Sequence, residues 1–315
     1  MKKTLTSLIV LLFALVSGVH AQTARRTMVV TIDDLPFVRM GEGEYLARAR
    51  PATAKILNAL KKHKAPAIGF VNEHALQEPR RDERIDLLRQ WVKSGMTLGN
   101  HTYSHPDFNN LTVEQFQEEI TKGDVVTREL MKGRQPYQLY FRHPFTHTGD
   151  TREKKEAVDK FLAARGYKVT PHTIDNSDWM FNVGYVDALQ KGDKALVERL
   201  RNEYLDFTIT ATEFAEKMSP QIFGREIPQI LVIHSNDITA DSLDEMLRRF
   251  EARGYKFVTL DAAMADPAYK TENTFVTKFG PTWLLRWAKS KDLNLNFSGD
   301  PDPPKWVMDL YNRKD

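Results

Sequence analysis

The stretch Met28-Val-Val-Thr-Ile-Asp-Asp-Leu-Pro36 decides the fold. Five residues with strand-forming character run directly into two adjacent carboxylates, and a proline ends the run. Side chains alternate between the two faces of a strand, so Asp33 and Asp34 cannot both be ordinary surface residues if the strand is buried. Where the strand ends, the alternation relaxes and both carboxylates can reach one cleft, in which one binds a cation and the other moves protons. The alternative is a polar turn after the strand.

The first 21 residues have the features of a secretory signal peptide. A lysine pair precedes an apolar run from Leu8 to Val16, and Val19-His20-Ala21 has the small-residue pattern of a cleavage site. The run is too short for a membrane span, and no later stretch approaches the ~20 apolar residues that a span needs. We expect secretion to the periplasm or the exterior, without stable membrane insertion of the mature protein. The alternative is an uncleaved anchor helix.

The composition excludes several classes of function. The predicted signal carries two lysines and no acids, so its removal lowers the formal net charge from +3 to +1. This balance gives no reason to expect binding to nucleic acid or to an anionic membrane surface. The chain has no cysteine, which excludes disulfides, thiolate metal sites and cysteine nucleophiles. A hydrophobic core must therefore stabilise the protein, and ~290 residues are enough to build one.

Short β-rich runs alternate with helical patterns along the rest of the chain. Strands are expected at 28–32, 65–71, 96–100, 139–141, 167–170, 229–233 and 255–260, and helices at 45–63, 81–94, 112–130, 151–165, 187–218 (as two helices) and 240–253. Strand–helix units with apolar, non-alternating strands predict parallel pairing. We predict an α/β fold, a distorted (β/α)7-type barrel that is closed or nearly closed and forms a single domain over residues 22–270.

The tail at 271–315 has a different composition. It carries Trp283, Trp287 and Trp306 together with several prolines. We expect a C-terminal helical tail packed on the barrel. The alternative is that these aromatic rings stack on carbohydrate.

Residues able to do chemistry collect where the predicted strands end, which is where α/β barrels place their working residues. They are Asp33 and Asp34, the run Asn100–His105, the run Arg142–Phe145, the run Asp175–Trp179, and His234. His101 and His105 are four residues apart, so a helical turn would bring both imidazoles to one metal ion. With a carboxylate from another strand end they would form a site with open coordination positions. Zinc is the default metal, and cobalt or nickel also fit these donors.

Five ordered motifs resemble those of the polysaccharide deacetylase family, the NodB-homology group of carbohydrate esterase family 4. They are Thr31-Ile32-Asp33-Asp34, His101-x-x-x-His105, Arg142-x-Pro144-Phe145, Asp175-x-x-Asp178-Trp179 and Ile230-Leu-Val-Ile-His234. The resemblance covers roughly residues 28–262, and it implies a NodB-like deacetylase fold.

The resemblance also implies a role for each site residue. Asp34, His101 and His105 would hold the metal. Asp33 would be the general base, and His234 the general acid. Arg142 would orient the base, the backbone near Phe145 would help to form an oxyanion site, and Asp178 and Trp179 would line the cleft, with Asp178 in the charge network around Arg142 or His234.

The motifs depart from the family pattern at several points. Leu35-Pro36 follows Asp34 where a glycine is usual, Thr146 stands where a glycine often occurs, and the segment 180–228 inserts helices between the last two motifs. His143 and His147 are interpreted as solvated loop histidines, with substrate contact as the alternative. These changes remove no catalytic group, but they alter the loops that shape the cleft.

The resemblance implies a metal-dependent hydrolase that removes N-acetyl groups from an amino-sugar polymer or oligosaccharide such as peptidoglycan or a chitin-like chain. Its partner would be the acetylated glycan, and the sequence leaves the oligomeric state open. One alternative is an esterase that removes O-acetyl groups, for example from xylan. The others are a carbohydrate-binding protein with a structural metal, and a metal-free barrel with satisfied polar strand ends.

Overall fold

The computed structural model describes residues 26–38, 45–77, 79–134 and 137–313. The predicted signal peptide lies outside these residues. Within them, none of the helices combines the length and the apolar character that a membrane span requires.

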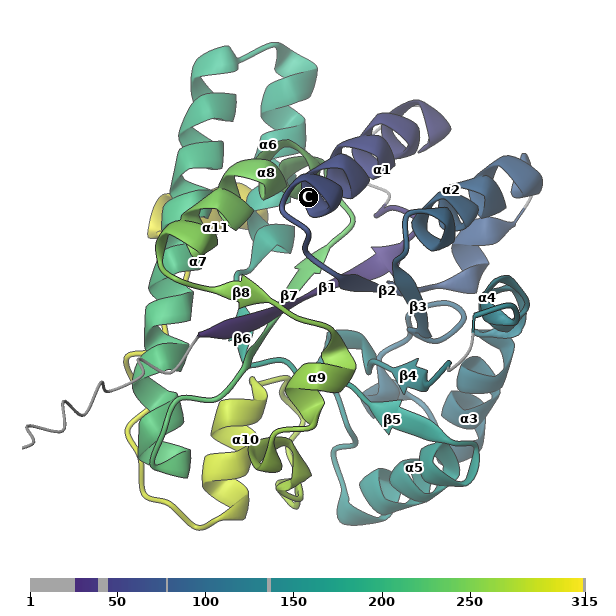
Figure 1. The fold of residues 1–315 in the computed structure, drawn as a ribbon, viewed down its shortest axis with the longest axis vertical. Helices are drawn as coiled ribbons and strands as arrows, with labels where there is room; N and C mark the ends of the chain where they lie inside the picture. Colours follow the sequence, from purple (N-terminus) through teal and green to yellow (C-terminus); the bar gives the residue numbers. More distant parts are fainter. Residues whose placement is uncertain (1–25, 39–44, 78, 135–136, 314–315) are drawn as a thin grey trace, which may run out of the picture.

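All strand pairs in the sheet are parallel, which confirms the predicted α/β class. The strands are β1 (Thr27–Leu35), β2 (Ala67–Val71), β3 (Thr97–Asn100), β4 (Leu139–Phe141), β5 (Tyr167–Val169), β6 (Ile174–Asp175), β7 (Gln229–His234) and β8 (Lys256–Phe257). Their order across the sheet is β5-β4-β3-β2-β1-β7-β6, and β8 pairs with the start of β1. The strand quoted at the outset, β1, is therefore central, with neighbours on both sides (Figure 1).

The barrel is curled but does not close, because no pairing joins β5 to β6 in the described residues. The sequence did not predict β6, which has two residues and follows β5 after a short loop. The strand expected at 255–260 is also shorter, because Thr259 caps the following helix through the N–H of Ala262.

Helices cover the outside of the curled sheet. They are α1 (Tyr45–Lys62), α2 (Arg81–Lys93), α3 (Val113–Lys122), α4 (Val125–Met131), α5 (Arg152–Ala164), α6 (Asp178–Lys191), α7 (Lys194–Phe223), α8 (Asp237–Ala252), α9 (Leu260–Met264), α10 (Trp283–Ser290) and α11 (Lys305–Asn312). In Figure 1, α3, α4 and α5 flank the β3–β5 side of the sheet, and α6, α7 and α8 flank the β7 side.

Two helix predictions were wrong in their boundaries. The helix expected over 112–130 is broken at Gly123, which packs on the loop after β3 so closely that a Cβ would lie 2.4 Å from the carbonyl carbon of Thr102. A new helix, α4, starts there, and the carboxylate of Glu73 accepts hydrogen bonds from the N–H groups of Val126 and Thr127 in its first turn. The helix pair expected from 187 begins at Asp178, nine residues earlier in the chain.

The side chains of β1 alternate between two apolar clusters. Val30 and Ile32 join the main core under the outer helices, whereas Val29 joins a smaller cluster inside the curled sheet with Ile68 and Phe70. Thr31 and Asp33 follow Val29 on the inner face by the two-residue period. The inner face thus changes from apolar to polar toward the carboxyl end of the strand.

The C-terminal segment packs on the barrel through two helices. The start of α10 is bonded to the loop after β5, where the N–H of Trp283 donates to the carbonyl of His172 at 2.9 Å. Trp283 and Trp287 are buried, and Val307 of α11 belongs to the main core. The guanidinium carbon of Arg199 lies over the Trp306 ring, 4.0 Å from the ring centroid. None of the three tryptophans lines the large cavity described below.

Candidate active site

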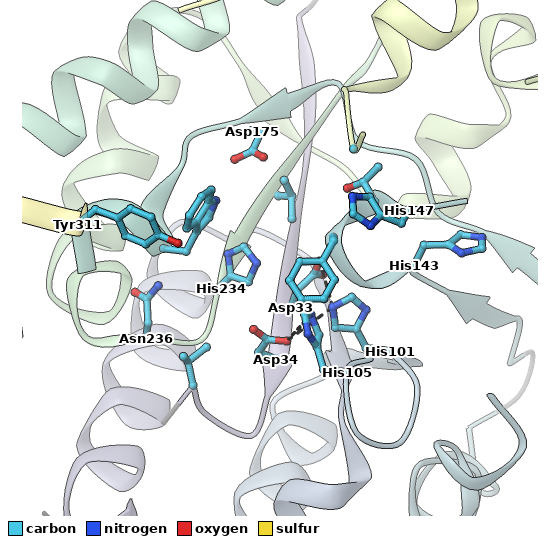
Figure 2. Close-up of a pocket in the computed structure, with 16 residues that line it drawn as sticks. Asp33, Asp34, His101, His105, His143, His147, Asp175, His234, Asn236 and Tyr311 are labelled. Carbon is cyan, nitrogen blue, oxygen red and sulfur yellow. Dashed lines mark ion pairs between the residues drawn. The ribbon is translucent and has the colours of Figure 1, made fainter. Parts of the chain in front are cut away.

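A β-bulge in β1 turns both aspartates toward one cavity. Ile32 pairs with Gly69 and Leu35 with Val71, so β1 has one residue more than β2 in this interval. The extra residue is accommodated by Asp34, whose φ of 61° lies in the left-handed region. Bulges of this kind redirect side chains at the ends of strands. Asp33 and Asp34 consequently line the same cavity although they are adjacent in the chain (Figure 2).

Asp34, His101 and His105 form a candidate metal site. The Oδ1 atom of Asp34 lies 3.6 Å from Nε2 of His101 and 3.5 Å from Nε2 of His105. The ligand atoms of the three residues all lie within 4.8 Å of one another. Bond lengths of ~2.0–2.2 Å put two ligands of one zinc ion roughly 3–3.5 Å apart, so small side-chain movements would complete the site. The Oδ1 atom of Asp34 is buried and accepts no hydrogen bond, as expected of an atom that awaits a ligand.

The surroundings of His101 hold it in the form that binds metal. Its Nδ1 lies 2.8 Å from the carbonyl oxygen of Arg142, which fixes the proton on Nδ1 and leaves the Nε2 lone pair facing Asp34. Burial lowers the pKa of His101 to about 4, so the ring is neutral at neutral pH. For Asp34, burial opposes ionisation, but His105, His234 and His101 together hold the pKa of its carboxyl below the ordinary value. The donor set is therefore one anion with a neutral imidazole, which suits a divalent cation.

Left-handed backbone conformations gather around this cavity. Among the described non-glycine residues nine have positive φ, and six of them stand at strand ends that face the site: Asp34, Thr102, His105, Phe145, Thr146 and Ser177. Such conformations cost of order 1–3 kcal/mol each and concentrate at functional sites. Thr146, at a φ of 58°, occupies the position at which the sequence motif lacks its usual glycine.

Arg142 lies behind Asp33 inside the barrel. Its guanidinium donates to the Thr31 hydroxyl at 2.7 Å and lies 5.0 Å from the Phe70 ring centroid. Its Nη1 is 3.9 Å from Oδ2 of Asp33, which is an ion pair without a direct hydrogen bond. His172, which the sequence analysis did not select, contacts the same guanidinium at 3.4 Å. The buried guanidinium thus lies next to the Asp33 carboxylate, which lines the cavity.

The partly exposed His234 and the buried Asp178 form a pair on the opposite side of Asp33. The Nδ1 of His234 lies 2.7 Å from Oδ1 of Asp178. The other carboxylate oxygen accepts from the N–H of His234, the amide of Asn236 and the hydroxyl of Thr239, at 2.7–2.9 Å. Burial alone would lower the pKa of His234, but the charge and hydrogen bonds of Asp178 raise it to about 10. Asp178 therefore joins the network of His234, one of the two partners expected for it.

The cavity has a volume of about 470 Å³, and its lining includes two exposed aromatic rings. Phe145 is 53 % exposed and packs edge-on against His105, with ring centroids 4.6 Å apart. Trp179 is 37 % exposed, lines the cavity and directly follows Asp178, the partner of His234. All nine residues selected from the sequence are at this end of the sheet, and Arg142 and Asp178 stand just behind the lining.

The sequence analysis gave no role to Asp175, Asn236 and Tyr311, which also line the cavity. Asp175 stood in a quoted motif and Asn236 lies two residues after His234, so their positions gave a signal. Tyr311 is in the C-terminal tail and no spacing connected it to a motif. In Figure 2 its hydroxyl end points into the cavity from the side of Asn236.

The interpretation of His143 and His147 as solvated was wrong. His143 is buried between Phe116 and Phe141, its ring nitrogens have no hydrogen-bond partner, and burial lowers its pKa well below the ordinary value. His147 is paired instead, with its Nδ1 2.7 Å from a carboxylate oxygen of Asp107. Both rings line the cavity.

The fold and the site together define a class of protein, the parallel α/β barrels that carry a two-histidine, one-aspartate cluster at the carboxyl ends of their strands. Comparison with known proteins agrees. The family model described as "Polysaccharide deacetylase" matches residues 20–164. This match confirms the resemblance to the family that the sequence motifs predicted, over somewhat less than half of the chain. The motifs at Asp178 and His234 lie beyond the matched segment.

Two curated relatives have stated activities. The peptidoglycan-N-acetylmuramic acid deacetylase PdaA of Bacillus subtilis is 26 % identical over 216 residues, which span 67 % of this chain and 66 % of the relative. A chitin deacetylase of Arthroderma benhamiae is 28 % identical over 157 residues, which span 50 % of this chain and 36 % of the relative. The chain thus matches just under two thirds of the first relative and about one third of the second.

Solved structures support the fold. The polysaccharide deacetylase Bc1974 of Bacillus cereus has a TM-score of 0.52 at 20 % identity, covering 75 % of this chain and 92 % of that chain. A CE4 family pseudoenzyme of Bacillus anthracis has a TM-score of 0.51 at 17 % identity, covering 76 % and 66 %. Since the same fold carries an enzyme and a pseudoenzyme, the activity of this chain has to be argued from its own residues.

Proposed function

We propose that this protein is a secreted, metal-dependent deacetylase that hydrolyses the N-acetyl groups of an amino-sugar polysaccharide or oligosaccharide. One observation supports the proposal most directly. Asp33, whose Oδ1 has no hydrogen-bond partner, lies between the metal-site residues around Asp34 and the paired His234. These are the parts that amide hydrolysis needs. The named activities of the peptidoglycan and chitin deacetylase relatives support the substrate class.

Asp34, His101 and His105 are the residues that would hold the metal, and the neutral state of His101 and the unsatisfied Asp34 oxygen fit this role. When bound, a divalent ion such as zinc, cobalt or nickel would supply Lewis-acid activation of water and of the acetyl carbonyl.

Asp33 is the proposed general base. The Asp33 residue is 4 % exposed, and Nη1 of Arg142 lies 3.9 Å from one of its carboxylate oxygens. The carboxylate accepts the proton of the attacking water as the oxygen of that water bonds to the acetyl carbon. The backbone N–H of Phe145 is the proposed donor to the oxyanion, because no hydrogen bond within the described residues uses it.

His234 is the proposed general acid. Asp178 holds the Nδ1 side of the ring, so Nε2 is the atom that can deliver a proton to the cavity. With a pKa of about 10 the ring is protonated at neutral pH. Breaking the carbon–nitrogen bond releases an amine, which is a poor leaving group until it gains this proton. The products are acetate and the free amino sugar.

The Asp178–His234 pair favours the amide over the ester alternative. An ester releases an alcohol or phenol, which departs with less help from an acid than an amine does. A site built only for O-acetyl groups would gain little from a carboxylate that accepts four hydrogen bonds to hold one imidazolium. His234→Ala should therefore impair amide substrates far more than ester substrates, and equal losses on both would argue against the acid role.

The deciding experiment measures acetate release from N-acetylated and O-acetylated glycans, with and without a chelator. The proposal expects release from an N-acetylated glycan, loss of this activity on chelation, and recovery when zinc or cobalt is returned. Activity confined to O-acetyl groups, or glycan binding with no acetate release from any substrate, would reject it.

The export of the protein and its domain boundaries belong to the same proposal. We propose that residues 1–21 are removed on secretion, that 22–270 carry the catalytic residues of the domain and that 271–315 are a tail packed on this part. Mass determination of the protein recovered from the cell exterior or periplasm tests the first point, since cleavage before Gln22 gives a defined mass.

A further inference from the structure

We propose that Tyr311 and Trp179 form an aromatic subsite that binds a sugar ring of the glycan on the His234 side of the cavity. This inference rests on the proposed function and extends it, because it assigns substrate binding to the C-terminal tail. Trp179 belongs to α6, and Tyr311 belongs to α11, the last helix.

Exposed aromatic side chains gather at the mouth of this cavity. Among the described residues, the exposed large hydrophobic side chains are Phe145, Trp179, Phe279, Val125 and Leu189. Phe145 and Trp179 line the cavity, and Phe279 precedes Gly280, which also lines it. Large apolar side chains left in water and collected at one place mark a binding surface. Aromatic faces next to a few polar groups suit a sugar, which has apolar C–H faces and a hydroxyl rim.

Tyr311 completes this surface. Its ring stands edge-on to Trp179, with centroids 5.1 Å apart and an interplanar angle of 82°. Within the described residues no hydrogen bond to its hydroxyl is found, and Figure 2 shows that end directed into the cavity. The proposed contribution to binding is that of the aromatic ring, which lines the cavity beside Trp179.

The tail holds Tyr311 in a fixed place. Leu310 packs closely on Gly184 of α6. A Cβ added to Gly184 would lie 3.0 Å from Cδ1 of Leu310. On the preceding turn Val307 is fully buried and Trp306 lies against Arg199. A ring that is positioned before the ligand arrives loses little freedom on binding, which is the condition for an effective subsite.

The position of the pair fixes which part of the glycan it meets. The acetyl group must lie near Asp33 and the Asp34 cluster, and the amine that leaves must lie near His234. The sugar ring carries this amine, so it extends from His234 away from the cluster, toward Trp179 and Tyr311. The subsite thus binds sugar rather than the acetyl methyl group.

The experiment compares Tyr311→Ala, Tyr311→Phe and a control, Asn312→Ala, which changes an exposed residue on the same helix. The probe is the tetrasaccharide of β-1,4-linked N-acetylglucosamine. Its Kd is measured calorimetrically in an Asp33→Asn background, and its KM in the active enzyme. Stacking of this kind corresponds to about tenfold in affinity. Tyr311→Ala should raise Kd and KM about tenfold, and Tyr311→Phe and Asn312→Ala should change them less than twofold.

Two readouts separate the possible failures. If the unchanged protein cleaves no acetylated glycan, the proposed function fails whatever Tyr311 does. If it cleaves the tetrasaccharide and Tyr311→Ala retains the original Kd and KM, the subsite is overturned while the function stands. Equal losses in Tyr311→Ala and Tyr311→Phe would also overturn it, because they would assign the effect to the hydroxyl. The melting temperature of each variant shows whether α11 remains docked.

Discussion

At the residue scale, Asp33 and Asp34 have the same side chain but different backbone conformations, and this difference separates their proposed roles. Asp33 pairs with His234 in the regular ladder between β1 and β7, whereas Asp34 has left the ladder at the bulge. The Asp34 carboxylate is closer to the histidines, at 3.5–3.6 Å, than that of Asp33, at 3.8 Å from His101. Asp33 is instead the carboxylate within ion-pair distance of Arg142. Geometry thus supports the same assignment of ligand and base that the family resemblance implied.

A first prediction separates the two aspartates. Asp33→Asn should keep one equivalent of metal and lose about 10²–10⁴-fold in kcat, because only the proton acceptor is removed. Asp34→Asn should lose both metal and activity. Elemental analysis of each purified variant beside its acetate-release rate checks this. Asp33→Asn protein with no metal, or Asp34→Asn protein with full metal, would reverse the assignment.

A second prediction concerns pH. The acid must be protonated to act, and the raised pKa of His234 keeps it protonated up to about pH 10, so this residue should impose no loss of activity on amide substrates near neutral pH. Asp178→Asn removes the charge that favours the imidazolium, so the pKa of His234 should fall and the alkaline limb of kcat/KM should move to lower pH. A pH profile measured on one N-acetylated oligosaccharide tests this. An unmoved alkaline limb would show that another group sets it.

At the scale of elements, α10 controls the shape of the loop after β4. Arg286 of α10 is buried, and its guanidinium donates to the carbonyls of Thr146, Phe279 and Pro281 and to the Thr148 hydroxyl, at 2.7–3.3 Å. Among the described residues no carboxylate lies within ion-pair distance of it, and burial lowers its pKa to about 10. This buried cation, which also lies over the Trp283 ring, donates its hydrogen bonds to loop oxygens and so holds the left-handed turn at Phe145 and Thr146 in place.

A third prediction follows for Arg286→Met, which keeps volume and removes the donors. Loosening the turn should displace the N–H of Phe145 and reduce kcat about tenfold or more, because small misplacements in a site cost rate heavily. The effect on stability should be smaller, since removal of a buried charge offsets the hydrogen bonds lost. Steady-state kinetics and thermal melting check this, with Lys289→Met on the exposed side of α10 as the control. An unchanged kcat would show that Arg286 does not determine the conformation of this turn.

These elements also show how far the sequence could be interpreted. Asp33, His101, Arg142 and His234 were predictable, because parallel strands bring their carboxyl ends to one edge whatever the helices do. The bulge was not, since the sequence Asp-Asp-Leu-Pro does not reveal where pairing slips by one residue. Tyr311 was not, because its approach depends on how α11 packs on α6.

At the scale of the whole molecule, the tail is part of the core. Trp283, Leu284, Trp287 and Val307 are all buried in the main apolar cluster, which also contains β1 and the outer helices. Burying such a side chain contributes about 1.5–3 kcal/mol, so four of them amount to roughly 6–12 kcal/mol. This is comparable with the entire stability of an ordinary protein, about 5–15 kcal/mol.

A fourth prediction is that a chain ending at residue 270 will not fold into an active barrel. It should aggregate or show no cooperative melting, because the surfaces under α10 and α11 become exposed. Circular dichroism and size-exclusion chromatography test this against a chain that lacks only residues 1–21, which should melt cooperatively. A soluble, cooperatively folded 22–270 protein would contradict the prediction.

The left-handed residues around the cavity bear on how this protein would respond to selection. Six positions there hold a non-glycine residue in a conformation that glycine adopts at no steric cost. A screen that rewarded heat resistance alone would favour exchanges that relieve such conformations, and two of the six are the proposed metal ligands Asp34 and His105. Improved thermal tolerance and lost catalysis would then arise from the same substitutions, so directed evolution of this protein has to score turnover in every round.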